Sequence, residues 1–286
     1  MIKRFYIMAA TLFCLAASCT QEPTGKTVYL KDYLTEEMLC DDAEPAIRKA
    51  LEECLNSNGS TLVLPGGTLH IKPDFCYGNY QKISNNDPSD KRMAFDIVGA
   101  EGLTIEGNGT TLMFSGFISP FNIKDSKNIS INDLNIDYTR TFHSEGLITD
   151  SGKDWVRLRF PKDYKVNLES GILVFKDDYR NEYPYGNLLE FDSSKKEVAH
   201  YVRDYWVWGP GLQAEALPDG EYKVYEKDIK VTKGNILVFG AASRLNPAFT
   251  LDGCDGFNLK NVNIWHCGGM GVIAQRSCDL ELDNVK

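Results

Sequence analysis

The sequence has few of the residues that bind phosphate or metal ions. It contains four histidines, and its 31 basic residues face 40 acidic ones with no basic cluster outside the N-terminal segment. Nucleic acids and anionic lipid surfaces need clustered Lys and Arg, so neither is predicted as a partner. The absence of a Cys-x-x-Cys pair or a histidine cluster gives no indication of a metal site or another cofactor. Acyl transfer has no support either, because neither Ser-x-x-Lys nor Gly-x-Ser-x-Gly occurs in a usable context. With a formal charge of −9, an uncharged partner such as a glycan fits better.

The N-terminus carries an apolar run that is too short to span a bilayer. It extends from Phe5 to Ala17 behind a basic start, which predicts a secretory signal over residues 1–19. The order Ala-Ala-Ser-Cys at its end resembles the lipobox of bacterial lipoproteins. We therefore expect lipidation of Cys19, a polar tether over residues 20–27, and an exported lipoprotein of the bacterial cell envelope with its lipid anchor in a membrane. Plain secretion is the alternative.

One apolar pattern occurs four times. Two apolar residues two positions apart are followed, after a gap, by two more with the same spacing, which is the period of short strands with alternate side chains inward. A small residue lies between the pairs, where a tight bend would exclude a wider side chain. The sets are Phe95, Ile97, Leu103 and Ile105; Phe121, Ile123, Ile129 and Ile131; Phe249, Leu251, Phe257 and Leu259; and Val272, Ala274, Leu280 and Leu282, with Ala100, Ser126, Cys254 and Ser277 between the pairs. Repeats of this length are typical of solenoids, so we predict an all-β fold, a right-handed parallel β-helix of the pectin-lyase-like type.

This pattern also predicts the domain organisation. Residues 28–138 contain an amphipathic stretch at 46–55, expected to be a helix that caps the first coil, and then the first coils. Between residues 139 and 240 short strands and turn residues are typical of a small antiparallel barrel or sandwich. The coil pattern resumes over 241–286, so the barrel is predicted to be an insertion. The pattern stops at Lys286 on an uncovered coil, so we expect a fragment of a longer protein.

The remaining six cysteines are Cys40, Cys54, Cys76, Cys254, Cys267 and Cys278. An even number in an exported protein permits disulfides, but a chain of this length can bury a core without them. We expect buried free thiols for most of them. Cys254 and Cys278 lie on successive coils, at positions of the repeat that differ by one. They could therefore pair or simply fill the interior.

Two outward side chains make one face of the predicted coils a candidate site. Aligning the third strand of two repeats places Ile136 opposite Ile264, so that Asp137 and Trp265 project outward together. A carboxylate beside an indole suits a sugar, because the ring packs on the aromatic face and the hydroxyl groups bind the acid. The alternative is that Trp265 packs against the inserted domain and Asp137 is a solvated surface acid.

Further candidates lie near this face. Arg140 and Arg244 flank the insertion, so their guanidinium groups should lie near the same rim, as substrate contacts or as structural ion-pair partners. His266 precedes the glycine-rich stretch 268–271, whose glycines either let a ligand approach the backbone or turn a corner of a coil. Gln275 points outward one coil further on and could donate to a hydroxyl group or belong to a structural polar ladder.

Three stretches of the chain resemble glycoside hydrolase family 110. They are Asp137–Arg140, Ser243–Phe249 and Trp265–Arg276, in which Arg-x-Asn-Pro and Gly-Gly-Met-Gly-x-Ile-Ala-Gln are the most specific parts. Members of the family are exo-acting α-1,3-galactosidases of gut bacteria that remove terminal galactose from blood-group-B and related glycans without a cofactor. The resemblance covers the chain from about Val28 to its end and includes the inserted barrel. It implies a rim of substrate contacts made of Asp137, Arg140, Arg244, Asn246, Trp265, His266 and Gln275.

The family resemblance also implies an inverting mechanism. In such enzymes one carboxylic acid protonates the leaving oxygen and a second activates water, with the two about 6.5 to 9.5 Å apart. The acids that the family places on the following coils would lie beyond Lys286, so we predict no catalytic acid or base here and expect no activity from the chain alone. Two alternatives are a pectin-directed β-helix hydrolase or lyase, for which a basic groove or calcium ligands would be expected, and a glycan-binding or adhesin β-helix.

Overall fold

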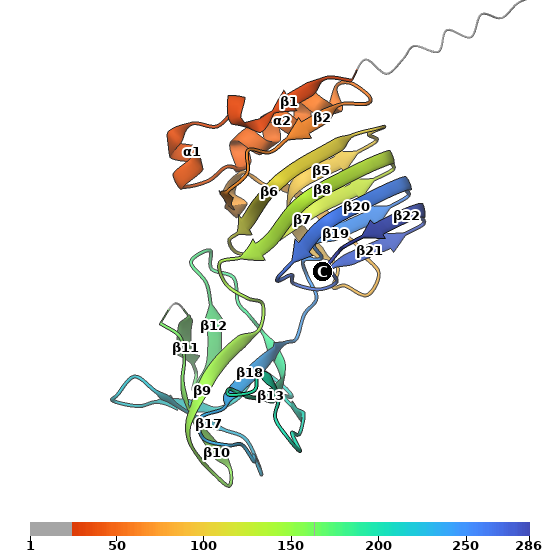
Figure 1. Cartoon of the computed structure of the whole chain (residues 1–286). Helices are drawn as coiled ribbons and strands as arrows, with labels where there is room; N and C mark the ends of the chain where they lie inside the picture. Colours follow the sequence, from red (N-terminus) through yellow and green to blue (C-terminus); the bar gives the residue numbers. More distant parts are fainter. Residues whose placement is uncertain (1–24, 163) are drawn as a thin grey trace, which may run out of the picture.

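The computed structural model describes residues 25–162 and 164–286, which form mostly β-structure with a short helical segment near the N-terminus (Figure 1). The predicted signal, Cys19 and most of the tether lie outside the described residues. Within that part of the chain, no helix has the length and apolar character needed to cross a membrane.

The first and last parts of the chain form two sheets of parallel strands. One consists, in spatial order, of β1 (Thr27–Tyr29), β2 (Thr61–Val63), β6 (Thr104–Phe114), β8 (Lys127–Tyr138), β20 (Asp255–Ile264) and β22 (Cys278–Asp283), with β3 (Thr68–Ile71) also beside β6. The other consists of β21 (Val272–Gln275), β19 (Phe249–Asp252), β7 (Ile118–Lys124), β5 (Ser89–Val98) and β4 (Tyr77–Gln81), where β4 is antiparallel to β5. From β5 onward these strands alternate between the two sheets along the chain. Each pair of strands therefore lies against the previous pair (Figure 1).

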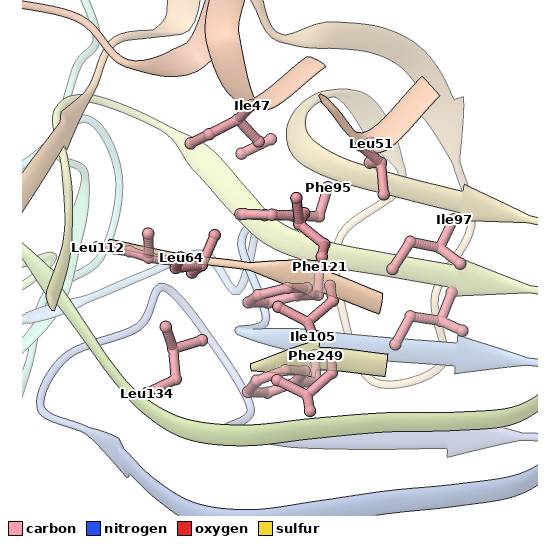
Figure 2. Packing of buried hydrophobic residues seen from close by; sticks show 14 of the residues in the cluster. Ile47, Leu51, Leu64, Phe95, Ile97, Ile105, Leu112, Phe121, Leu134 and Phe249 are labelled. Atoms are coloured by element: carbon pink, nitrogen blue, oxygen red, sulfur yellow. The ribbon is translucent and has the colours of Figure 1, made fainter. Parts of the chain in front are cut away.

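The strand register stacks the four apolar sets as the repeat predicts. Phe95 pairs with Phe121, Phe121 with Phe249, and Phe249 with Val272. The phenylalanine rings lie face to face, with centroids 4.5 Å apart for the first pair and 4.7 Å for the second (Figure 2). Because each ring is fully buried, it contributes roughly 1.5–3 kcal/mol of hydrophobic stabilisation.

The small residues occupy tight bends between the two sheets. Each follows a residue with left-handed backbone, and these are Gly99 (φ 67°), Asp125 (φ 48°), Gly253 (φ 69°) and Arg276 (φ 49°). At the bends a serine hydroxyl links one coil to the next: Ser126 Oγ accepts from the N–H of Ala100 at 3.1 Å, and Ser277 Oγ accepts from the N–H of Cys254 at 3.0 Å. The small side chains therefore satisfy backbone donors at bends where a bulky residue would not fit.

The helix expected over residues 46–55 is α2 (Glu44–Leu55), and it follows the shorter α1 (Glu36–Cys40). Its apolar face is buried, and Ile47 and Leu51 lie over the end of the phenylalanine stack (Figure 2). Helix α2 therefore covers the first coil.

Residues between β8 and β19 form a separate antiparallel unit (Figure 1). Its main sheet has the order β14 (Glu197–Val198), β13 (Tyr185–Asp192), β18 (Ile236–Ala241), β9 (Ser144–Gly152), β10 (Trp155–Arg159), β17 (Tyr222–Tyr225) and β16 (Ala214–Ala216), with β15 (Tyr205–Trp206) beside β13 and a hairpin of β11 (Lys165–Glu169) and β12 (Ile172–Lys176). Phe175, Leu188 and Phe239 belong to its own core. After this unit, β19 pairs with β7 and β20 with β8, so the coil stack continues directly across it.

The cysteines in the described part of the chain are all free thiols. Cys54, Cys76 and Cys254 are buried, as expected, whereas Cys40 and Cys278 are exposed and Cys267 is partly buried. Pairing of Cys254 with Cys278 is therefore not found. The expectation that most thiols are buried holds for three of the six, because Cys40 ends the exposed helix α1 and Cys278 begins the exposed strand β22.

Candidate functional site

The parallel register of β8 and β20 brings Asp137 next to His266. Ile264 pairs with Ile136, and the N–H of Trp265 donates to the carbonyl of Ile136 at 3.0 Å. Just beyond these inward residues, Nδ1 of His266 and Oδ1 of Asp137 lie 2.6 Å apart. The predicted juxtaposition of these two segments is therefore present in the structure.

The hydrogen bonds of Asp137 define which atom of His266 faces a ligand. Oδ1 of Asp137 also accepts from the N–H of Tyr138 at 2.7 Å, so the carboxylate acts as an acceptor in both contacts. Nδ1 of His266 must then carry the proton that it donates, and Nε2, on the other side of the ring, makes no contact with Asp137. The pair can therefore accept a hydrogen bond from a ligand hydroxyl group at Nε2.

Trp265, the residue before His266, presents an open aromatic surface. It is 66% exposed, so it does not pack into the antiparallel unit, which was the alternative considered from the sequence. An exposed indole offers a flat apolar face to one side of a sugar ring. The side chain of Asp137 is only 26% exposed and is held by His266, so it is not a freely solvated acid.

His143 is a further polar group at this position, and the sequence patterns did not single it out. Its Nδ1 accepts from the N–H of Ala241 at 2.8 Å, which requires the neutral ring with its proton on Nε2. Burial lowers the pKa of His143, and the positive charge of a protonated His266 lowers it further. The sequence could have pointed to His143 only through its position, three residues after Arg140, where the chain enters the antiparallel unit.

Arg140 is turned into the antiparallel unit. Its guanidinium carbon lies 3.4 Å from the ring centroid of Tyr183 and 4.5 Å from that of Tyr164. Its nitrogens donate to the carbonyl of Thr141 and the hydroxyl of Ser144, both at 2.8 Å. Burial lowers the pKa of Arg140, and no described carboxylate forms an ion pair with it. Neither sequence alternative describes this arrangement. The side chain of Arg140 holds the chain just after the end of β8 against the aromatic rings of the antiparallel unit, through contacts worth up to about 2 kcal/mol when desolvated.

Arg244 and Asn246 belong to a segment that is fastened to the chain before β5. Nη1 of Arg244 donates to Oδ1 of Asn85 at 2.8 Å, and its backbone N–H donates to Asp87 Oδ2 at 3.0 Å. Asn246 is only 2% exposed, and its amide donates to Ser119 Oγ at 3.2 Å. The structure therefore does not bring the side chain of Asn246 to the surface that carries Asp137.

The glycines at positions 268 and 269 are needed because other parts of the protein pack closely against them. A Cβ atom on Gly268 would lie 2.5 Å from the ring of Phe142, and one on Gly269 would lie 2.8 Å from Asn86 Oδ1. The close neighbours of these glycines are thus protein groups. Gln275 lies on β21 in the other sheet, where its Oε1 accepts from the N–H of Ser84 at 2.7 Å. Of the predicted rim, Asp137, Trp265 and His266 are brought together, and Gln275 is not among them.

One group of acidic and thiol side chains has the spacing of metal ligands among the described residues. It consists of Asp255, Cys278 and Asp279, all exposed, with ligand atoms within 4.8 Å of one another. Cys278 Sγ already donates to Asp255 Oδ1 at 3.3 Å, so the cluster is internally bonded.

Known proteins resemble both the antiparallel unit and the chain as a whole. Residues 144–237 match the family model described as GLAA-B beta-barrel domain I. Alpha-1,3-galactosidase A of Shewanella woodyi is 30% identical over 99% of this chain and 47% of that protein. Alpha-1,3-galactosidase B of Bacteroides thetaiotaomicron is 22% identical over 98% of the chain and 46% of that protein, and alpha-1,3-galactosidase A of Bacteroides fragilis is 23% identical over 100% and 48%.

These findings define the class as a mostly β protein in which a GLAA-B barrel interrupts stacked parallel strands. Within that class the chain is similar along nearly its whole length to the alpha-1,3-galactosidases A and B, which agrees with the resemblance of its sequence motifs to glycoside hydrolase family 110. The chain spans about half the length of these relatives.

Proposed function

We propose that this chain is part of a bacterial glycosidase that releases terminal α-1,3-linked galactose from blood-group-B-type or related glycans. The observation that carries the proposal is similarity to alpha-1,3-galactosidases along nearly the whole chain, together with the bonded pair of Asp137 and His266 and the exposed indole of Trp265. Such a surface is suited to an uncharged sugar, because it combines an aromatic face with directional hydrogen-bonding groups.

The proposed architecture is a right-handed parallel β-helix into which residues 139–240 are inserted as a barrel. Alternation of consecutive strands between two parallel sheets supports the helix, and the direct pairing of β19 with β7 supports the insertion. In this arrangement the substrate-binding surface lies where the coils meet the inserted domain, because Asp137 lies near the end of β8, just before the chain leaves the coils.

Asp137 and His266 are proposed to bind the terminal galactose. Asp137 is engaged by two donors, so it is suited to orient His266, whose Nε2 then accepts from a sugar hydroxyl group. Trp265 would cover an apolar face of the ring. The chemistry proposed is inversion, with a general acid and a general base on opposite sides of the glycosidic bond. No acid or base is assigned among the described residues.

Binding of α-1,3-galactobiose, measured by isothermal titration calorimetry, tests this proposal directly. The matched control ligand is α-1,4-galactobiose, which has the same composition but a different linkage. We expect the α-1,3 isomer to bind more tightly and the difference to disappear in His266→Ala. Equal binding of the two isomers by the unmodified chain would contradict the assignment of linkage.

The non-catalytic alternative is a glycan-binding protein, and release of product separates the two. Free galactose from the blood-group-B trisaccharide is expected from the galactosidase, whereas a binding protein retains the glycan intact. Binding without release by the protein in its native, full extent would favour the alternative.

A further part of the proposal is export as a lipoprotein anchored through Cys19. The order of basic, apolar and small residues in 1–19 supports it.

A further inference from the structure

Two tryptophans of the antiparallel unit are unusually exposed. Trp206 is 61% exposed and Trp208 is 83% exposed, whereas Val207 between them packs against the core of the unit. Because side chains alternate along an extended segment, both indoles project from the same side of the chain. Exposed aromatic surface of this kind marks binding sites more often than it occurs by chance on a soluble domain.

Both indoles line a groove of about 760 Å³ between the antiparallel unit and the coils. Asn187 adds an amide on the side of the tryptophans, and Asn85, Asp87 and Arg244 form the opposite wall. Ala241, Ala242 and Arg244 also line it, so the groove lies where the chain returns from β18 to β19. Its volume is within the range of sites that enclose a multi-ring ligand.

The two charged groups that line this groove already have partners in the protein. The Asp87 carboxylate accepts from the backbone N–H of Arg244 at 3.0 Å, and the guanidinium of Arg244 donates to Oδ1 of Asn85 at 2.8 Å. The lining thus carries one cation and one carboxylate, which favours a neutral occupant over a charged one. Asn85 and Asn187 are amides, which bind hydroxyl groups without a charge.

The groove adjoins the surface that carries Asp137 and His266. Arg244 lines the groove, and the N–H groups of the next two residues, Leu245 and Asn246, donate to the carbonyl of Gly268 at 2.8 and 3.0 Å, two residues after His266. The wall of the groove that carries Arg244 is therefore bonded to the segment that carries His266.

We infer that this groove binds the sugars that follow the terminal galactose, namely the neutral reducing-side part of an oligosaccharide. This inference rests on the proposed function for the identity of the terminal sugar. The indoles of Trp206 and Trp208 supply flat faces for successive pyranose rings, and Asn187 and Arg244 supply hydrogen bonds to their hydroxyl groups.

The test uses two probes with the same chain. Lacto-N-neotetraose, a neutral tetrasaccharide without α-linked galactose, reports on the groove, and α-1,3-galactobiose reports on the surface at His266. Trp206→Ala and Trp208→Ala are each expected to weaken tetrasaccharide binding by about tenfold, as measured by titration calorimetry. Tyr201→Ala is the matched control, because Tyr201 is 91% exposed on the same unit but does not line the groove.

The outcomes separate the two proposals. Tetrasaccharide binding that is weakened by both tryptophan substitutions and unchanged in Tyr201→Ala supports the groove. Binding that is unchanged in both tryptophan variants, or equally weakened in Tyr201→Ala, overturns it. If the tetrasaccharide binds as expected while α-1,3-galactobiose does not bind at all, the groove stands as a glycan site and the assignment of galactose fails. Circular dichroism of each variant confirms that it is folded.

Discussion

His266 donates from Nδ1 to Oδ1 of Asp137 at 2.6 Å, although 129 positions separate the two residues in the sequence. The contact exists because β20 pairs in register with β8, and not with any strand of the unit between them. A parallel register thus builds a polar pair from two coils that are adjacent only in space.

Removing this pair should both weaken sugar binding and lower stability. His266→Ala deletes a hydrogen bond to a charged acceptor, which contributes roughly 1.5–3 kcal/mol, and it removes the proposed contact to the ligand. We expect α-1,3-galactobiose to bind about tenfold more weakly, measured by titration calorimetry. His200→Ala, an exposed histidine of the antiparallel unit, is the control. Equal losses in both variants would argue against a role for His266.

Glu44 should make stability depend on pH. It is fully buried at the start of α2, where burial raises its pKa to about 7. Below about pH 4.5 it is protonated in the folded and unfolded chains alike. As the pH rises from there through 7, Glu44 keeps its proton in the folded chain but loses it in the unfolded chain. The free energy of unfolding therefore falls over this range, by at most about 3 kcal/mol.

Urea unfolding at pH 5 and pH 8 measures this loss. Glu44→Gln should have a smaller fall in unfolding free energy between the two pH values than the unmodified chain. Glu36→Gln changes an exposed glutamate of α1 and should leave the fall unchanged. If Glu44→Gln retains the full pH dependence, another group is responsible.

The glycine at position 268 should be required for packing. A Cβ atom there would lie 2.5 Å from the ring of Phe142, so Gly268→Ala is expected to lower stability by about 1–3 kcal/mol, as read from thermal or urea unfolding. Gly271→Ala is a matched control, because its Cβ would meet Ile264 only at 3.4 Å. Combining Gly268→Ala with Phe142→Leu should recover part of the loss, and a lack of recovery would show that Phe142 is not the obstacle.

Cys19 should carry the lipid that anchors the protein. In cells that process lipoproteins, Cys19→Ser is expected to abolish incorporation of a labelled fatty acid and to move the protein out of the detergent phase. Cys40→Ser, which alters an exposed cysteine outside the predicted signal, should change neither readout. Fatty-acid labelling that persists in Cys19→Ser would contradict the predicted anchor.

The stacked strands could be predicted from the sequence because the signal is local and repeated. Phe95, Phe121 and Phe249 occupy equivalent places in sets with the same internal spacing, and side chains that alternate inward must meet when the sets are stacked. The same alignment put Ile264 opposite Ile136 and so brought Asp137 near Trp265 and His266.

The orientation of the arginines could not be predicted in this way. Arg140 turns toward Tyr183 and Tyr164, which lie on the inserted unit at distances in sequence that no periodicity encodes. Asn246 is buried although asparagine is usually exposed, because its amide bonds to Ser119 on a neighbouring coil. The exposed Trp206 and Trp208 carry no sequence signal, since the same residues in a short strand are as readily part of a core.

The contact of Arg140 with two tyrosine rings has a mechanical consequence. It holds the chain just after the end of β8 against the inserted unit, which supplies the tryptophan wall of the groove, while Asn85, Asp87 and Arg244 supply the other wall. Arg140→Leu would remove these aromatic contacts and leave every residue that lines the groove unchanged. A change in glycan binding in this variant would therefore report the position of the inserted unit and not the chemistry of the groove.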